Sequence, residues 1–264
     1  MKKYLEFAKI WFKAEIIYRF DLAMTIAEVI GRVMFAWLIW GAVFIGRDTV
    51  GGFSFEAMLL YYIVASFIAT LDICGGVSGE ISHEIRNGNF SKFMVIPVNT
   101  QLYWLAQNLG VVSLRVVFVL PAAFVCALLF GAGGGIGSFS AILLGLALIP
   151  VGLAFMVTYH YFIGLLAFKF QDVWVFIMVQ FTAVEFSKGA LLPLNLLPET
   201  MFNVIRFLPF PHMVFTPAML FIGRMDLREG LYSLGILLLW LIGMTVVAQI
   251  TYGRLRVKYD GVGI

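Results

Sequence analysis

Charged side chains are scarce in this chain: Asp, Glu, Lys and Arg make up 12% of its 264 residues. In a soluble domain about 25% of the residues are charged. A chain that is 62% hydrophobic has more apolar surface than the core of a soluble domain of this size can bury. We therefore exclude a soluble globular domain and expect an all-α integral membrane protein, because lipid cannot satisfy the backbone of an open sheet. The net charge of +3 is small, and no basic patch interleaved with aromatic residues indicates nucleic-acid binding.

Several chemistries lack their characteristic residues. Only two cysteines occur, Cys74 and Cys126, and both lie in apolar stretches, where they behave as small hydrophobic residues. His160 has no second His or Cys at ligand spacing, so we expect no metal site. The chain lacks the Gly-x-x-x-x-Gly-Lys-Ser/Thr loop that holds nucleotide phosphates, and the glycine-rich stretch from Gly131 to Gly137 follows no strand. We therefore expect no nucleotide hydrolysis and no bound cofactor on this chain.

Long apolar stretches are what the sequence does contain. About 20 helical residues cross about 30 Å of hydrocarbon, and we place six such spans in a single membrane domain, 1–264. They cover Leu22–Gly46, Glu56–Val77, Tyr103–Phe130, Ala141–Phe168, Val173–Leu192 and Leu231–Tyr252. In residues 1–21, charges recur at helical spacing opposite an apolar side, which predicts an interfacial helix. The alternative is an ordinary helical hairpin packed on other cytoplasmic protein.

The distribution of Lys and Arg predicts the orientation in the membrane. If the N-terminus is cytoplasmic, most basic residues lie on that side, whereas the first two outer loops carry only Arg47. The inner residues are Lys2, Lys3, Lys9, Lys13, Arg19, Arg86, Lys92, Lys169, Arg254, Arg256 and Lys258. The outer segment 192–228 also carries arginines, but long segments count less in this rule. We therefore expect a multi-pass protein of the plasma membrane with both termini in the cytoplasm.

Prolines interrupt segment 192–228, between the last two spans. They are Pro193, Pro198, Pro209, Pro211 and Pro217, and they forbid one continuous helix although the segment stays apolar. Non-helical backbone at membrane depth is tolerated only against protein or water. We therefore predict broken helices that re-enter the membrane from its outer side, with an outer loop lying on the interface as the alternative.

The loop between the second and third spans, residues 78–102, is the most patterned polar stretch. Ile81, Ile85 and Phe93 could hold this stretch to the membrane surface while its charged residues face water. Asn87-Gly88 would end a helix through a left-handed residue. The pattern predicts a short, exposed cytoplasmic helix, and the alternative is a solvated connector.

Ionisable residues inside the spans each cost about 2.5 to 3.5 kcal/mol at the membrane centre, so they should face protein or water. Glu28 and Arg32 are one helical turn apart, and we interpret them as a local ion pair, with a substrate contact as the alternative. Glu185 and Lys188 have similar spacing and are interpreted as structural or as lining a vestibule.

Arg115 in the third span has no such neighbour. It either reaches the inner surface or pairs with Asp72 or Glu185 across helices. His160 is interpreted as a hydrogen-bonded interior residue. An intramembrane enzyme or an ion-coupled secondary transporter would use Glu185, His160 or Asp72, and both remain alternative functions, although the spacing does not bring these groups together.

Several motifs resemble the permeases of the type-2 ATP-binding-cassette (ABC) exporter family. Ile-Arg-x-Gly-x-Phe at 85–90, followed by Lys-Phe at 92–93 and Pro-Val at 97–98, resembles the first cytoplasmic loop of these permeases. Tyr18-Arg19-Phe20-Asp21 resembles the stretch before their first helix, and the prolines of 192–210 resemble the stretch before their last span. Val95-Ile96 departs from the family, where a basic residue is expected before the proline.

The resemblance implies the permease subunit of an ATP-driven exporter, not an enzyme. Two such chains, identical or homologous, would form the path, and two cytosolic ATPase subunits would bind ATP and Mg beneath them. The resemblance makes residues 80–90 a coupling helix that docks on the ATPase, with the candidate contacts Glu80, His83, Glu84, Ile85, Arg86, Asn87, Gly88 and Phe90. An amphipathic or lipid-like substrate, such as a drug, a peptide or a glycolipid, would suit the apolar path.

Overall fold

The computed structural model describes residues 2–17, 19–130, 135–170 and 172–258. Within these ranges the chain is helical and has no β-strand beyond an isolated pair between Val50 and Phe53. Tyr18 of the motif at 18–21 and residues 131–134 of the glycine-rich stretch lie outside the described residues. The all-α membrane protein expected from the sequence is confirmed.

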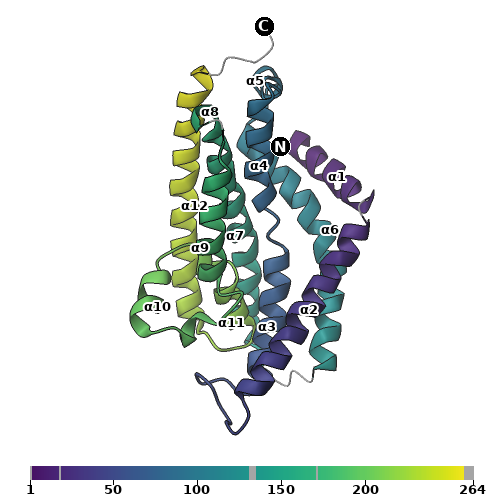
Figure 1. Cartoon of the computed structure of the whole chain (residues 1–264), viewed down its shortest axis with the longest axis vertical. Helices are drawn as coiled ribbons and strands as arrows, with labels where there is room; N and C mark the ends of the chain where they lie inside the picture. The colour runs from purple at the N-terminus through teal and green to yellow at the C-terminus, as the bar shows by residue number, and fades with distance from the viewer. Residues whose placement is uncertain (1, 18, 131–134, 171, 259–264) are drawn as a thin grey trace.

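The helices follow one another along the chain as Figure 1 shows. Their bounds are α1 Lys2–Ile17, α2 Arg19–Val43, α3 Phe55–Thr70, α4 Gly75–Arg86, α5 Ser91–Val95, α6 Thr100–Leu129, α7 Phe139–Leu165, α8 Ala167–Phe170, α9 Trp174–Lys188, η1 Leu194–Leu196, α10 Glu199–Ile205, η2 Phe210–His212, α11 Phe215–Phe221, α12 Leu227–Leu255 and η3 Arg256–Lys258.

Among the described residues, five helical stretches are long and apolar enough to cross a membrane: Phe20–Val43, Phe55–Arg86, Thr100–Leu129, Phe139–Phe170 and Leu227–Leu255. A sixth arises if Glu199–Ile205 and Phe210–Phe221, which are bent by 80°, count as one span. The predicted span Val173–Leu192 is not among these candidates, so the prediction of a membrane span there is not borne out. Its helix α9 has 15 residues, which corresponds to about 22 Å, because Gly189 adopts φ +77° and ends it.

Side-chain caps fix where three of the long helices begin. Ser54, Asn99 and Ser138 each accept a hydrogen bond from the backbone N–H three residues further on, at 3.1 to 3.3 Å. Such a cap satisfies one of the N–H groups that a helix start leaves without a partner. Helices α6 and α7 therefore start slightly earlier than the apolar pattern alone predicts.

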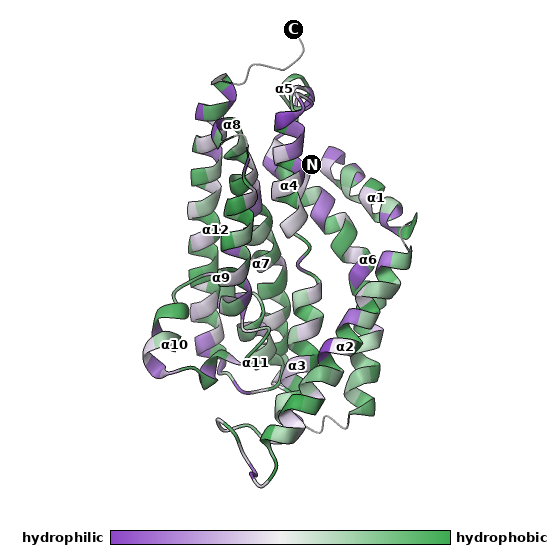
Figure 2. Ribbon diagram, in the orientation of Figure 1, coloured by the Kyte–Doolittle hydropathy of each residue, from purple (hydrophilic) through white to green (hydrophobic). Residues whose placement is uncertain are grey.

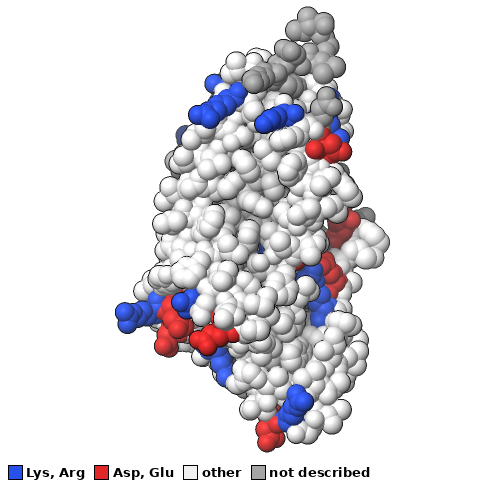
Figure 3. Space-filling model, turned by 60° about the vertical axis from the view of Figure 1, so that its left-hand side comes forward, with Lys and Arg blue, Asp and Glu red and all other residues white. Residues whose placement is uncertain are grey.

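Charge and hydropathy divide the molecule along its length. Helices α5 and α8 and the last turns of α12 lie at one end, which we call the α5 end, and α10 and α11 lie towards the other, the α10 end (Figure 1). Figure 2 shows apolar residues dominating the helices between these ends. On the face shown in Figure 3, charged side chains gather near both ends, and the middle is uncharged except along its right-hand edge. Along α12, no Lys, Arg, Asp or Glu stands between Glu229 and Arg254. These features fit a membrane-spanning belt.

The Pro-rich segment 192–228 is broken into η1, α10, η2 and α11, as its prolines predict. Helix α11 packs against α7 and α3, and Phe215, Ala218 and Leu220 are at most 3% exposed. The segment therefore folds back into the helix bundle, which favours the re-entrant alternative over a loop lying on the surface.

Helix α1 lies along α6. The ring of Phe7 meets that of Tyr103 edge to face, with centroids 5.1 Å apart, and the Asn99 N–H donates to the Tyr4 hydroxyl at 3.0 Å. The predicted helix in residues 1–21 is thus present and docked on its own chain. Its position at the membrane interface stays a prediction.

Candidate coupling segment and intramembrane charges

The second predicted span, Glu56–Val77, is not one continuous helix. Helix α3 ends at Thr70, residues 71–74 form a break, and α4 begins at Gly75. Asp72 caps the break, because its Oδ1 accepts a hydrogen bond from the Cys74 N–H at 3.2 Å. Sequence reasoning missed this break, although an aspartate followed closely by two glycines signals one.

Of the helix predicted at residues 80–90, only 80–86 are helical, as the end of α4, and residues 87–90 form a turn. The helical part is less exposed than expected. Ile81 and Ile85 are 0% and 5% exposed, and α4 packs on α7 and α8. A Cβ at Gly164 of α7 would lie 2.7 Å from the Ile81 Cβ, so glycine permits this close approach. The expectation that Ile81 and Ile85 hold a free helix to the membrane surface is therefore wrong, since the bundle takes up that apolar face.

The opposite face of α4 remains accessible. Glu80, His83 and Arg86 are exposed, and Asn87 Nδ2 lies 2.8 Å from the His83 ring nitrogen Nε2. Glu84 forms a 2.6 Å ion pair with Lys92 of α5. The candidate polar contacts thus stand together on one side of the α5 end, where an aqueous partner could reach them.

The turn after α4 brings different apolar residues to the surface. Gly88 adopts φ +76°, which confirms the predicted left-handed helix end. Phe90, one of the candidate contacts, is fully buried and packs edge to face on Phe168 at 5.2 Å. Beyond it, the side chains that we call the α5 tip are exposed: Met94 at 39%, Val95 at 85% and Ile96 at 48%. The tip includes the two residues at which the sequence departs from the family pattern.

Lys188 joins two carboxylates inside the bundle. Its Nζ lies 2.6 Å from Asp72 Oδ2 and 2.6 Å from Glu185 Oε1, and the side chains of Lys188 and Asp72 are only 5% and 4% exposed. The local pair of Glu185 and Lys188 is confirmed, whereas the participation of Asp72 was missed. The ion pair of Lys188 with Asp72 thus connects the end of α9 to the break between α3 and α4.

The groups that an intramembrane enzyme would need do approach one another. Asp72, His160 and Glu185 line one cavity of about 70 Å³, far below the 300 Å³ or more of a usual ligand site. Ser78 Oγ lies 3.2 Å from His160 Nδ1, which confirms the interior, hydrogen-bonded histidine. Within the described ranges, no three His, Cys, Asp or Glu side chains gather where they could hold a metal ion.

Glu28 and Arg32 form the predicted ion pair on α2, at 2.6 Å. Arg115 pairs with neither Asp72 nor Glu185: its Nε lies 3.6 Å from Oε1 of Glu15, so its partner belongs to α1. The alternative that Arg115 reaches the inner surface stays a prediction. Arg32 also lines a cavity of about 240 Å³ between α2, α3 and the turn after α9. The charges of the spans are therefore distributed over separate places instead of forming one site.

Comparison with known proteins gives the chain a family. No curated protein matches its sequence. Residues 30–263, which include every predicted span except the start of the first, match the family described as ABC-2 family transporter protein. The chain therefore belongs to the ABC-2 transporter family, as a membrane-spanning permease subunit of an ABC transporter.

Proposed function

We propose that this permease exports an amphipathic or lipid-like substrate and is driven by two ATPase subunits that dock on its α5 end. The observation that carries the proposal is the exposed apolar α5 tip beside the polar face of α4. An apolar patch rimmed by polar residues at the surface is typical of a protein interface. ATP and Mg would bind to the ATPase subunits.

Helix α4 is suited to carry motion from the tip into the membrane. Ile81, Ile85 and Phe90 pack the inner half of the span on α7 and α8, so this part would move as a body. Its other end is the break at 71–74, where Lys188 holds it to α9. A displacement by the ATPase would therefore change the angle at the break and shift α9.

A second permease chain, identical or homologous, would complete the path beside α2. Glu28 and Arg32 expose 51% and 39% of their side chains within an otherwise apolar span. Charges at membrane depth need protein or water around them. A path between the α2 helices of two chains would supply that environment.

Replacing Val95 with aspartate should prevent docking. A carboxylate placed in an apolar interface without a partner costs several kcal/mol, so we expect at least about tenfold less ATPase to co-purify with the permease in mild detergent. Ile45→Asp is the matched control, because Ile45 is 79% exposed and lies beyond α2, away from the tip. Equal recovery of the ATPase with both variants would contradict docking at the tip.

The proposed orientation can be tested with single cysteines, because both native cysteines are buried. A membrane-impermeant maleimide should label Asp48→Cys in intact cells and Ser91→Cys only in inside-out vesicles. Both positions are exposed, and they lie at opposite ends of the molecule. The reverse pattern would place the α5 tip outside, where no cytosolic ATPase could reach it.

A further inference from the structure

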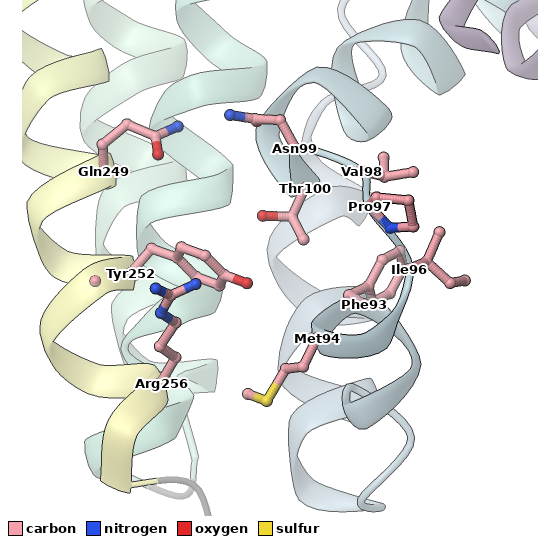
Figure 4. A pocket seen from close by; sticks show the side chains of 11 residues that line it. Phe93, Met94, Ile96, Pro97, Val98, Asn99, Thr100, Gln249, Tyr252 and Arg256 are labelled. Carbon is pink, nitrogen blue, oxygen red and sulfur yellow. The ribbon is translucent and has the colours of Figure 1, made fainter.

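A groove of about 510 Å³ lies between the last turns of α12 and the segment that joins α5 to α6 (Figure 4). Gln249, Tyr252 and Arg256 form one wall, since side chains three and four residues apart share a helix face. Met94 and Ile96 belong to the opposite wall, which is mainly apolar. The groove thus has one polar and one apolar side.

The charge of the groove is positive. Among the described residues that line it, Arg256 alone is charged and none is a carboxylate. In the part of the chain that the structure describes, Arg256 forms no ion pair, and its guanidinium lies over the Tyr252 ring at 5.2 Å. An arginine without a carboxylate partner beside polar groups is suited to a phosphate.

Two further groups can donate to the same ligand. Figure 4 shows the Tyr252 hydroxyl and the Asn99 amide nitrogen directed into the space between α12 and the α5–α6 segment. Asn99 Oδ1 accepts from the Leu102 N–H at 3.1 Å, so the helix cap fixes the amide and leaves its nitrogen turned to the groove. Arginine, hydroxyl and amide together form a set of donors for an anion.

The depth of the groove points to a lipid. Arg254, next to Gly253 of the lining, ends the uncharged stretch of α12, so the groove lies at the level where headgroups meet hydrocarbon. Met94 and Ile96 are 39% and 48% exposed and offer an apolar surface to the glycerol and acyl part of a lipid. Basic pockets between membrane helices at this level bind anionic headgroups.

We propose that this groove binds an anionic phospholipid of the cytoplasmic leaflet. The phosphate lies on Arg256 and receives hydrogen bonds from Tyr252 and Asn99, and the glycerol end packs against the groove side of Met94 and Ile96. Val95, the most exposed residue of the tip, lies outside the lining and stays free for the ATPase. The choice of leaflet rests on the orientation proposed above, whereas the binding itself does not. Because the same ligand touches α12 and the α5 tip, it holds the tip in a fixed position relative to the last span.

The test compares retention of phosphatidylglycerol by the purified full chain and by Arg256→Gln, using native mass spectrometry in mild detergent. Loss of the charge-assisted hydrogen bonds should reduce retention about tenfold or more. Arg254→Gln removes the same charge two residues away, outside the lining, and should retain the lipid. Phosphatidylcholine should be retained more weakly than phosphatidylglycerol by the unaltered chain.

Equal retention by the unaltered chain and Arg256→Gln would overturn the proposal, as would equal retention of the two lipids. Inorganic phosphate that displaces phosphatidylglycerol at millimolar concentration would make the groove a simple anion site. Loss of the lipid whenever a co-purified ATPase is present would assign the groove to that partner. The first measurements need neither ATPase nor transport, so their failure would leave the proposed function intact.

Discussion

Replacement of Lys188 with methionine is expected to lower the free energy of unfolding by about 3 to 5 kcal/mol, the usual effect of removing one partner from a buried ion pair. Methionine keeps most of the length and apolar surface of the lysine side chain and removes the ammonium group, with its charge and its hydrogen-bond donors. Asp72 would then remain 4% exposed with no cation beside it, and Glu185 would lose its 2.6 Å partner. Unfolding in mixed micelles of mild detergent and dodecyl sulfate measures the change.

Lys169→Met is the matched control, because Lys169 is an exposed lysine of α8 whose contact is the face of Phe170. Its removal should cost less than about 1 kcal/mol, as for other surface charges. Adding Asp72→Asn to Lys188→Met should restore part of the lost stability, since the uncompensated carboxylate disappears. If the two lysine substitutions lower the free energy of unfolding equally, the buried pair does not stabilise the break. The same conclusion follows if the double variant has a lower free energy of unfolding than Lys188→Met alone.

The helical membrane architecture could be predicted from the sequence because each membrane span needs a long run of apolar residues, which local composition shows directly. Apolar stretches of sufficient length predicted the long helices, and the prolines predicted the broken segment 192–228. Asn87-Gly88 gave a helix end that the structure places at Gly88. Each of these signals lies within a few neighbouring residues, where sequence spacing and geometry are tightly related.

Sequence spacing could not predict whether the apolar face of a helix packs against lipid or against protein. Ile81 and Ile85 do form one face of a helix, as their spacing predicts. The same pattern serves a helix on a lipid surface and a helix packed on protein, so it could not reveal that α7 covers this face. As a result, the exposed apolar residues were expected in α4, whereas the structure has them at the α5 tip.

The prediction of ion pairs between different helices failed for a related reason. The pairs Glu28 with Arg32 and Glu185 with Lys188 were predicted because their members are one turn apart on a single helix. Asp72 is 116 residues from Lys188, and Arg115 meets a carboxylate of the distant helix α1. Such partners depend on which helices touch, and spacing along one helix carries no information about that.

Adding a single methyl group at Gly110 is expected to separate α1 from α6. A Cβ there would lie 2.3 Å from the Ala8 carbonyl oxygen and 3.1 Å from the Phe12 nitrogen. Both are backbone atoms of a helix, so no side chain can move aside. We expect Gly110→Ala to destabilise the contact by about 1 to 3 kcal/mol and to speed amide hydrogen exchange in α1 by about 5- to 150-fold.

Gly243→Ala is the control with the opposite expected sign. A Cβ at Gly243, in the middle of α12, meets nothing within 4 Å, so alanine there should gain up to about 1 kcal/mol of helix stability. If α1 also positions the docking segment, through the hydrogen bond of Asn99 to Tyr4, Gly110→Ala should reduce ATPase co-purification while Gly243→Ala does not. Unchanged exchange in α1 of Gly110→Ala would mean that the two helices have room to separate locally, and that the contact does not hold α1 in place.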